Sequence, residues 1–153
     1  MSQADRKRRH QARLARIEQV QVVAGHAGRG RVDHEATLLE RARMLDEELA
    51  AHQATEAGLA AFDRLLKVVE LRGTARTPEV TELLDALWNR HPLPLAVLRG
   101  VEPRVADDML ALLDAFRWSR VDLVTEVTGG PRRVAKVLAA APPQLESVVR
   151  VAR

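Results

Sequence analysis

The chain is 153 residues long, 46% of them hydrophobic, and carries a formal net charge of +3. This length suits one domain, or a small domain with an extended helical element, and the hydrophobic share excludes disorder throughout the chain. The absence of cysteine excludes a disulfide framework, a zinc–cysteine site, an iron–sulfur cluster and a thiol nucleophile. No apolar run reaches the roughly 18 residues that span a bilayer, and the basic N-terminus lacks the apolar core of a secretory signal. We therefore expect a soluble cytoplasmic protein that does not contact a membrane.

The first predicted helix spans residues 2–24. Ser2 is a suitable N-cap, and a stripe at three- and four-residue spacing follows it. The stripe consists of Leu14, Ile17, Gln21 and Ala24. Three glycines then interrupt the pattern within residues 25–31, which predicts a flexible turn between helices.

A long helix is predicted over residues 33–72, with Asp33 as its N-cap. A narrow apolar seam of the coiled-coil kind occupies its first half, and a second stripe runs from Leu59 to Val69. The seam residues are Leu38, Ala42, Leu45 and Leu49. Because the stripe shifts at residues 55–58, two helices with a bend there are the alternative to one helix, which we prefer. A seam this narrow needs a partner helix, so we predict a homo-oligomer with Leu38, Leu45 and Leu49 in its interface.

Shorter amphipathic helices are predicted beyond a composition boundary at residues 73–76. Thr77-Pro78-Glu79 combines a capping hydroxyl, a proline suited to the first helical position and an acid favoured by the helix dipole. A further helix is predicted to begin at Glu102-Pro103. A short helix with Ser119 as its N-cap is predicted to end near residue 127, and another is predicted over residues 132–140. The last predicted helix follows Pro142-Pro143 and is lined by Leu145, Val148 and Val149. The predicted class is all-α, with a long helical hairpin over residues 1–72 followed by a compact bundle of short helices over residues 74–153.

Charge is distributed unevenly along the chain. Residues 1–31 and 117–153 carry an excess of Lys and Arg, whereas residues 32–116 carry an excess of Asp and Glu. The basic ends could follow a phosphate backbone, or the basic end of one subunit could lie on the acidic middle of another.

The segment 119–141 is similar to a helix-turn-helix, because a short helix, a turn at residues 128–131 and a helix that opens with cations follow one another. Arg132, Arg133 and Lys136 are its predicted nucleic-acid contacts, since the first residues of the second helix would meet base edges or phosphates. The alternative is an ordinary corner between two helices with a solvated basic face.

The N-terminal basic run is the second predicted nucleic-acid contact. Its residues would add phosphate contacts that do not depend on base sequence. They are Arg6, Lys7, Arg8, Arg9 and Arg13. The alternative is a solvated tail.

No set of side chains in the sequence has the spacing of an assembled active site or of a metal site, so we expect no catalytic residue, no metal and no cofactor. The predicted function is that of a small nucleic-acid-binding protein, a regulator or accessory subunit of a nucleoprotein assembly, with duplex DNA as the expected partner. The alternative is a non-enzymatic structural or adaptor subunit that oligomerises, or binds a protein partner, through its long helices.

Overall fold

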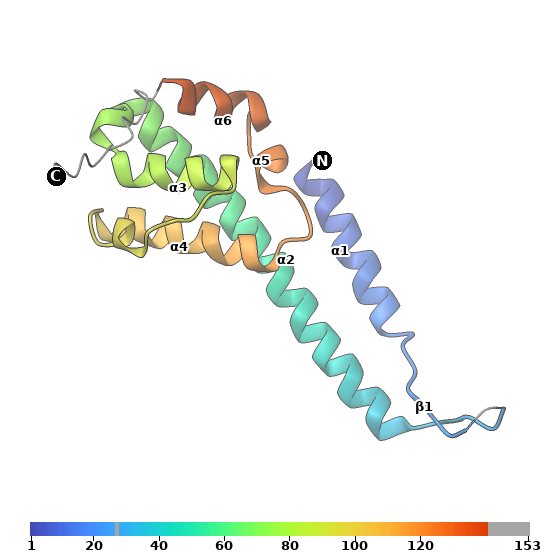
Figure 1. The fold of residues 1–153 in the computed structure, drawn as a ribbon. Coiled ribbons are helices and arrows are strands. Elements are labelled where there is room, and N and C mark those ends of the chain that lie inside the picture. The colour runs from blue at the N-terminus through green and yellow to red at the C-terminus, as the bar shows by residue number, and fades with distance from the viewer. Residues whose placement is uncertain (27, 141–153) are drawn as a thin grey trace, which may run out of the picture.

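A computed structural model describes residues 1–26 and 28–140 of the chain (Figure 1). The described residues form six α-helices, two short 3-10 helices and one two-stranded sheet, which confirms the predicted all-α class. Residue 141 of the predicted helix-turn-helix segment, and the predicted last helix with Leu145, Val148 and Val149, lie outside the described residues. Within the described part, no helix is long and apolar enough to cross a membrane.

Helix α1 spans Gln3–Ile17 and begins at the predicted N-cap. The Ser2 hydroxyl accepts a hydrogen bond from the Asp5 amide at 3.2 Å, and the Asp5 carboxylate accepts one from the Ser2 amide at 3.1 Å. This reciprocal capping box satisfies two amides that a helix start would otherwise leave unpaired.

The predicted continuation of this helix to residue 24 is wrong. Strand β1 (Val23–Ala24) instead pairs antiparallel with β2 (Arg31–Val32), and the predicted flexible turn closes a hairpin. The β-branched side chains of Val20, Val22 and Val23 favour extended backbone over helix. Gly25, with φ at 136°, then supplies a turn conformation that other residues rarely adopt.

Helix α2 is a single helix, His34–Arg72, as preferred from the sequence, and Asp33 caps it by accepting a hydrogen bond from the Ala36 amide at 2.9 Å. Gly58 does not mark a bend. It lies against helix α4 (Pro103–Trp118), where a Cβ on Gly58 would come within 2.0 Å of the Cβ of Ala115. Glycine at this position therefore allows two helices to approach closely.

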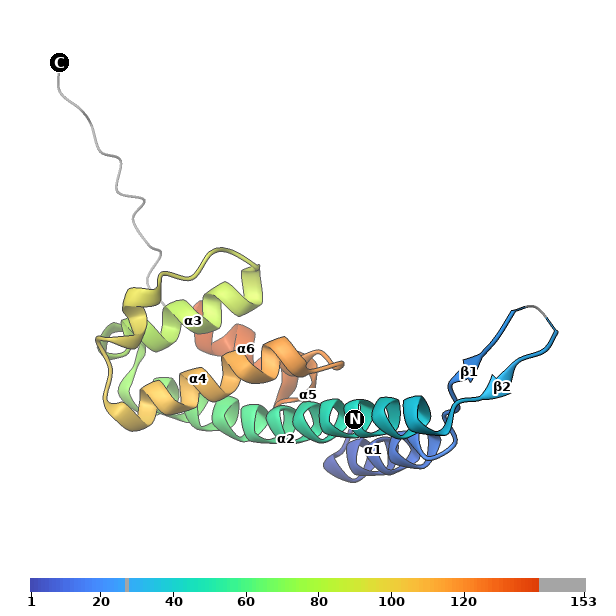
Figure 2. The same ribbon diagram turned by 90° about the horizontal axis from the view of Figure 1, so that it is seen from below.

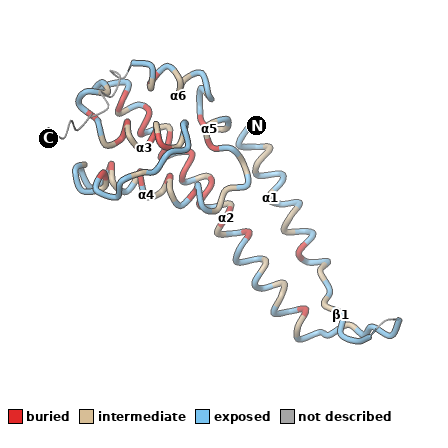
Figure 3. Tube along the Cα trace, in the orientation of Figure 1, coloured by how far each residue is buried: buried red, intermediate tan, exposed pale blue. Residues whose placement is uncertain are grey.

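Four helices and two 3-10 turns lie on one side of the second half of α2 (Figures 1 and 2). They are η1 (Thr74–Arg76), α3 (Pro78–Asn89), η2 (Leu95–Leu98), α4, α5 (Leu123–Glu126) and α6 (Gly130–Ala139). Phe62, Leu65 and Leu66 of α2 are fully buried among them. Figure 3 shows that buried residues concentrate here and are sparse in α1 and in the first half of α2. We call α1, the hairpin and the first half of α2 the arm, and the remaining described residues the bundle.

Two predicted caps in the bundle differ from the structure. The Thr77 hydroxyl donates to the Gly73 carbonyl at 3.0 Å and does not cap α3, although Pro78 occupies its first turn as predicted. Helix α5 is capped by Asp122, which accepts from the Val124 amide at 3.1 Å, and not by Ser119. The Ser119 hydroxyl instead bonds the backbone of Val121, so the expected helix shrinks to a single turn.

Candidate nucleic-acid interface

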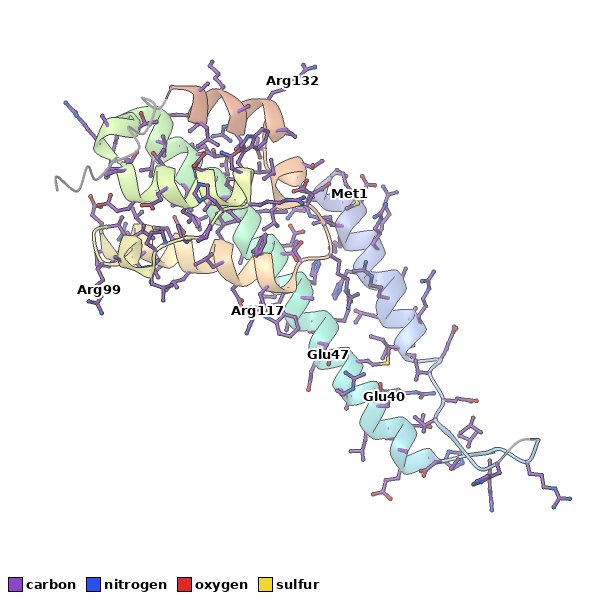
Figure 4. All side chains as sticks on the ribbon, viewed as in Figure 1. Met1, Glu40, Glu47, Arg99, Arg117 and Arg132 are labelled. Atoms are coloured by element: carbon purple, nitrogen blue, oxygen red, sulfur yellow. The ribbon has the colours of Figure 1, made fainter. Side chains whose placement is uncertain are left out.

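Helix α1 is fastened to the rest of the molecule mainly by charge, because Ile17 is the one residue of this helix that is buried. Arg6 Nε donates to Glu56 of α2 at 2.6 Å, and Arg6 Nη1 donates to Glu126 of α5 at 3.2 Å. The N-terminal ammonium of Met1, which Figure 4 places beside α5, also donates to Glu126, at 3.3 Å. These ion pairs tie the start of α1 to both α2 and α5.

A buried carboxylate on α2 forms the second tie. Glu48 is only 3% exposed, and His10 Nδ1 and Arg120 Nη1 each lie 3.0 Å from its oxygens. Arg13 Nη1 approaches the same carboxylate to 3.6 Å. A buried carboxylate is tolerated only when cations and hydrogen bonds compensate it, so Glu48 holds α1 and the segment after α4 together.

Two histidines stack beside this carboxylate. The ring centroids of His10 and His52 are 3.9 Å apart and the ring planes are 6° from parallel. Burial lowers the pKa of His52, because it disfavours the imidazolium, and the neighbouring His10 lowers it further. The hydrogen bond from Arg6 lowers the pKa of Glu56, and the same bond raises the pKa of Arg6. The structure thus favours a charged Arg6–Glu56 pair and a neutral His52.

The five predicted N-terminal contacts occupy different environments. The side chain of Arg6 is only 12% exposed and two carboxylates engage its guanidinium, so its predicted phosphate contact would require these ion pairs to break. Arg13 shares Glu48 but remains partly exposed, and Arg8 is exposed while bonded to Asp5. Lys7 and Arg9 are exposed and make no ion pair with any described residue. Within one turn of α1, carboxylates therefore engage Arg6, whereas Lys7 and Arg9 are exposed without ion pairs among the described residues. The run of basic residues in the sequence does not reveal this difference.

The available cations of the arm extend from α1 into the hairpin. Each is exposed and has no ion pair within residues 1–26 and 28–140. They are Lys7, Arg9, Arg16, Arg29 and Arg31. The hairpin projects from the end of the arm that is farthest from the bundle, as both ribbon views show (Figures 1 and 2). Arg29 and Arg31 are absent from the predicted contact set, and the alternation of glycine and arginine at residues 28–31 was the signal for them.

The predicted contacts of α6 also divide. Arg132 and Lys136 are exposed, and Figure 4 shows Arg132 projecting away from the body of the bundle. Arg133 faces inward: its guanidinium donates to Glu70 at 2.7 and 2.8 Å and to Asp63 at 2.6 Å. These carboxylates raise the pKa of Arg133, the bond to Glu70 most strongly. Arg133 therefore clamps α6 to α2, and its predicted nucleic-acid contact stays a prediction.

The lengths of α5 and α6 weaken the helix-turn-helix resemblance. Its first helix, α5, has four residues, too few to form the paired helices of that motif, and α6 has ten. What remains of the resemblance is a turn at Gly129 followed by the exposed cations of α6.

The leucine seam lies on a face of α2 that the described residues leave uncovered. Leu38, Leu45 and Leu49 are 66%, 41% and 45% exposed. The role of these leucines in an oligomer interface stays a prediction, and their exposed side chains are accessible to a partner.

The charged cluster around Glu48 encloses a cavity of about 70 Å³, lined by Arg9, His52, Trp118 and neighbouring residues. This is room for a few water molecules only. Among the described residues, no group of three or more His, Cys, Asp or Glu side chains is placed to hold a metal ion. The arrangement can therefore anchor helices and present cations.

Residues 59–141 match DUF7673, described as a family of unknown function, and this match covers more than half of the chain. The chain belongs to that family. The matched part contains residues 59–72 of α2 and all of α3 to α6, whereas α1, the hairpin and the leucine seam precede it. Neither the curated proteins nor the solved structures include a match to the chain.

Proposed function

We propose that this member of the DUF7673 family is a non-enzymatic nucleic-acid-binding protein that grips the phosphate backbone of duplex DNA with its arm. It would act as a regulator or accessory subunit of a nucleoprotein assembly, in the cytoplasm as expected from the sequence. The observation that carries the proposal is the set of five exposed arm cations without ion pairs among the described residues, Lys7, Arg9, Arg16, Arg29 and Arg31.

The ion pairs of α1 support this use of the outer cations. Arg6 and His10 hold the inner face of the helix against α2 and the bundle, so Lys7 and Arg9 stand on a fixed support. Cations that are already positioned lose less conformational freedom when they meet phosphates. They are also exposed, and each phosphate contact releases condensed counterions from the DNA.

The hairpin adds reach to the arm. A two-stranded ribbon is narrow enough to enter a DNA groove, and guanidinium groups at its edge suit phosphates and the narrow minor groove. Arg132 and Lys136 of α6 would add contacts from the bundle, where the exposed first turn of a ten-residue helix also favours anions.

The test is a pair of double variants with equal loss of charge. R29Q/R31Q removes two cations from the hairpin, and R99Q/R104Q removes two exposed bundle cations that have no ion pair among the described residues; Figure 4 shows Arg99 at the opposite end of the bundle from Arg132. Fluorescence anisotropy with a labelled duplex measures affinity at several salt concentrations. We expect R29Q/R31Q to reduce the salt slope by about 2 and R99Q/R104Q to leave it unchanged. Equal effects of the two variants would show that binding depends on the net charge of the chain and not on the cations of the arm, which would overturn the proposal.

A second candidate function follows from the leucine seam. Three leucines of one helix face remain 41–66% exposed, and an apolar row of this kind marks a protein-interaction surface. In this alternative the chain is a structural or adaptor subunit that oligomerises, or binds a protein partner, through α2. Replacing Leu45 and Leu49 by Asp would dissociate such an assembly, whereas an unchanged mass in solution would exclude the seam as its interface.

A further inference from the structure

An apolar groove of about 810 Å³ opens between α3, α4 and the α5–α6 corner. Most of its walls are aliphatic or aromatic, and the main contributors are Leu83, Leu87, Trp88, Leu113, Phe116 and Leu123. Phe116 is 65% exposed and Trp88 is 38% exposed, so the two largest side chains of the groove remain in contact with water. Grooves of this volume and composition are typical of binding sites.

The rim of the groove carries positive charge at the end of α3. Arg90, in the left-handed conformation at φ 58°, lines the groove and makes no ion pair with any described residue. His91 lies beside it, and its Nε2 is 2.5 Å from the Asp85 carboxylate, which raises the pKa of His91. Asp122, the one carboxylate that lines the groove among the described residues, already accepts hydrogen bonds from the Val124 amide and the Thr125 hydroxyl. An acidic group on the occupant would therefore meet Arg90 first.

The same chain carries a surface with the complementary properties. On α2 the leucine seam is flanked by Glu35 and Asp46, which fall on one side of it at helical spacing. Both acids are exposed and have no ion pair in the described part of the chain. The seam thus offers a row of leucines with a negative edge, and the groove offers an apolar trough with a positive edge.

We propose that the groove of one copy receives the leucine seam of a second copy. This inference deepens the second candidate function, on which it rests, by naming the partner and the surface that binds the seam. Because the two surfaces differ, the contact is heterologous, and repeating it builds a ring or an open chain of subunits.

Charge favours this pairing over antiparallel contact between two seams. In an antiparallel pair the acids Glu35 and Asp46 of both copies would lie along the same edge of the interface, and like charges across an interface oppose association. Seam against groove instead sets these acids opposite Arg90 and His91. It also covers Phe116 and Trp88, which contact between two seams leaves in water.

The test uses two variants with lesions on different surfaces, both at exposed positions. F116D damages the groove, and L45D/L49D damages the seam. Light scattering after size-exclusion chromatography, or sedimentation, measures the mass of the full chain, which is 17.0 kDa for one copy. We expect the wild type to form assemblies whose mass grows with concentration, and each variant alone to be monomeric, with association weakened more than tenfold.

Mixing the two variants gives the discriminating result. F116D retains an intact seam and L45D/L49D retains an intact groove, so an equimolar mixture should form a dimer and stop there. If F116D still assembles like the wild type while L45D/L49D does not, the seam pairs with itself or another surface, and the groove inference fails while the second candidate function stands. If the wild type stays monomeric at every concentration, the groove inference fails together with the oligomerising form of the second candidate function. If L45D/L49D assembles like the wild type, the seam is not the interface and both fail.

Two further measurements protect the test against misfolding. R90E changes only an exposed charge on the groove rim and should weaken assembly, with far-UV circular dichroism confirming an intact fold. W118F leaves Trp88 as the single tryptophan of the chain, and its emission should shift to the blue as the assembly forms. A Trp88 spectrum that is the same in monomer and assembly would show that the groove stays open, and would overturn the inference.

Discussion

Replacing Glu48 by Gln tests the claim that charge holds α1 in place. The substitution keeps the shape of the side chain but removes the charge that His10, Arg13 and Arg120 face. Breaking a fully buried ion pair costs about 3–5 kcal/mol, and a single hydrogen bond to a charged group is worth about 1.5–3 kcal/mol. The side chains of Arg13 and Arg120 are 39% and 52% exposed, so both can regain water when the charge of Glu48 is removed. We therefore expect the free energy of unfolding to fall by about 2 kcal/mol, within the range for a single hydrogen bond to a charged group.

The assay is urea denaturation followed by far-UV circular dichroism, with thermal unfolding beside it. For a chain of this size, about 2 kcal/mol corresponds to a decrease in Tm of about 4–8 °C. Glu47→Gln is the matched control, since Glu47 is the next residue, is exposed and pairs only with Arg43 among the described residues. It should change stability by less than about 0.5 kcal/mol. Equal stabilities of the two variants would refute the reasoning, because Glu48 would then be no more than a surface carboxylate.

Three further perturbations test other parts of the structure. Gly58→Ala should destabilise the protein by about 1–3 kcal/mol, because its Cβ would overlap that of Ala115; a gain of about 1 kcal/mol in urea denaturation, as at an exposed helical site, would contradict the close approach of α2 and α4. His52→Asn should flatten the dependence of stability on pH. Because folding lowers the pKa of His52, the unfolded chain binds more protons than the folded chain. In the wild type, stability that is present above about pH 6.5 is therefore lost as the pH falls through the folded pKa of His52. An identical pH profile for the variant would exclude His52 as the cause. Arg133→Gln should lower the free energy of unfolding by about 1–2 kcal/mol and leave DNA affinity unchanged. Arg132→Gln should instead leave stability unchanged and weaken DNA binding. A folded R133Q variant with weakened binding would show that Arg133 contacts the DNA.

The sequence predicted those parts of the fold that depend on local signals. The caps at Ser2 and Asp33 and the prolines at the starts of α3 and α4 were placed correctly, because side chain and backbone interact there within one helical turn. The seam also lies on one exposed face of α2, as its spacing indicates. The hairpin was missed because two-residue strands leave no alternating pattern, and helical spacing continued through the valines by chance.

The roles of the cations were harder to predict than their positions. Arg6 and Arg133 differ from their neighbours Lys7 and Arg132 only in the direction in which the helix points them, and that direction depends on packing against distant residues. The carboxylates that engage them lie 50 to 120 positions away for Arg6 and 63 to 70 positions away for Arg133. Contacts at such separations leave no local pattern. Glu48 shows the same effect, since its neighbours Asp46 and Glu47 are exposed and nothing in the sequence distinguishes it from them.

The family match separates the molecule along a line that the structure also shows. Residues 59–140 of this match lie in the bundle, with its dense core, whereas the arm before them has few buried residues and five exposed cations without ion pairs among the described residues (Figure 3). In our account the bundle is a stable support, and the arm carries the surface that meets nucleic acid.

The most direct test of this account is the salt dependence of duplex binding by the full chain. If Lys7, Arg9, Arg16, Arg29 and Arg31 each meet a phosphate, together they contribute about −4.5 to the slope of log K against log salt, which alone lowers affinity about 500-fold between 50 and 200 mM salt. Neutralising all five to Gln should remove this contribution and leave only the smaller salt dependence of Arg132 and Lys136, while circular dichroism stays unchanged. Absence of binding at 50 mM salt, or a slope that the five substitutions leave intact, would contradict the central claim that the arm binds nucleic acid.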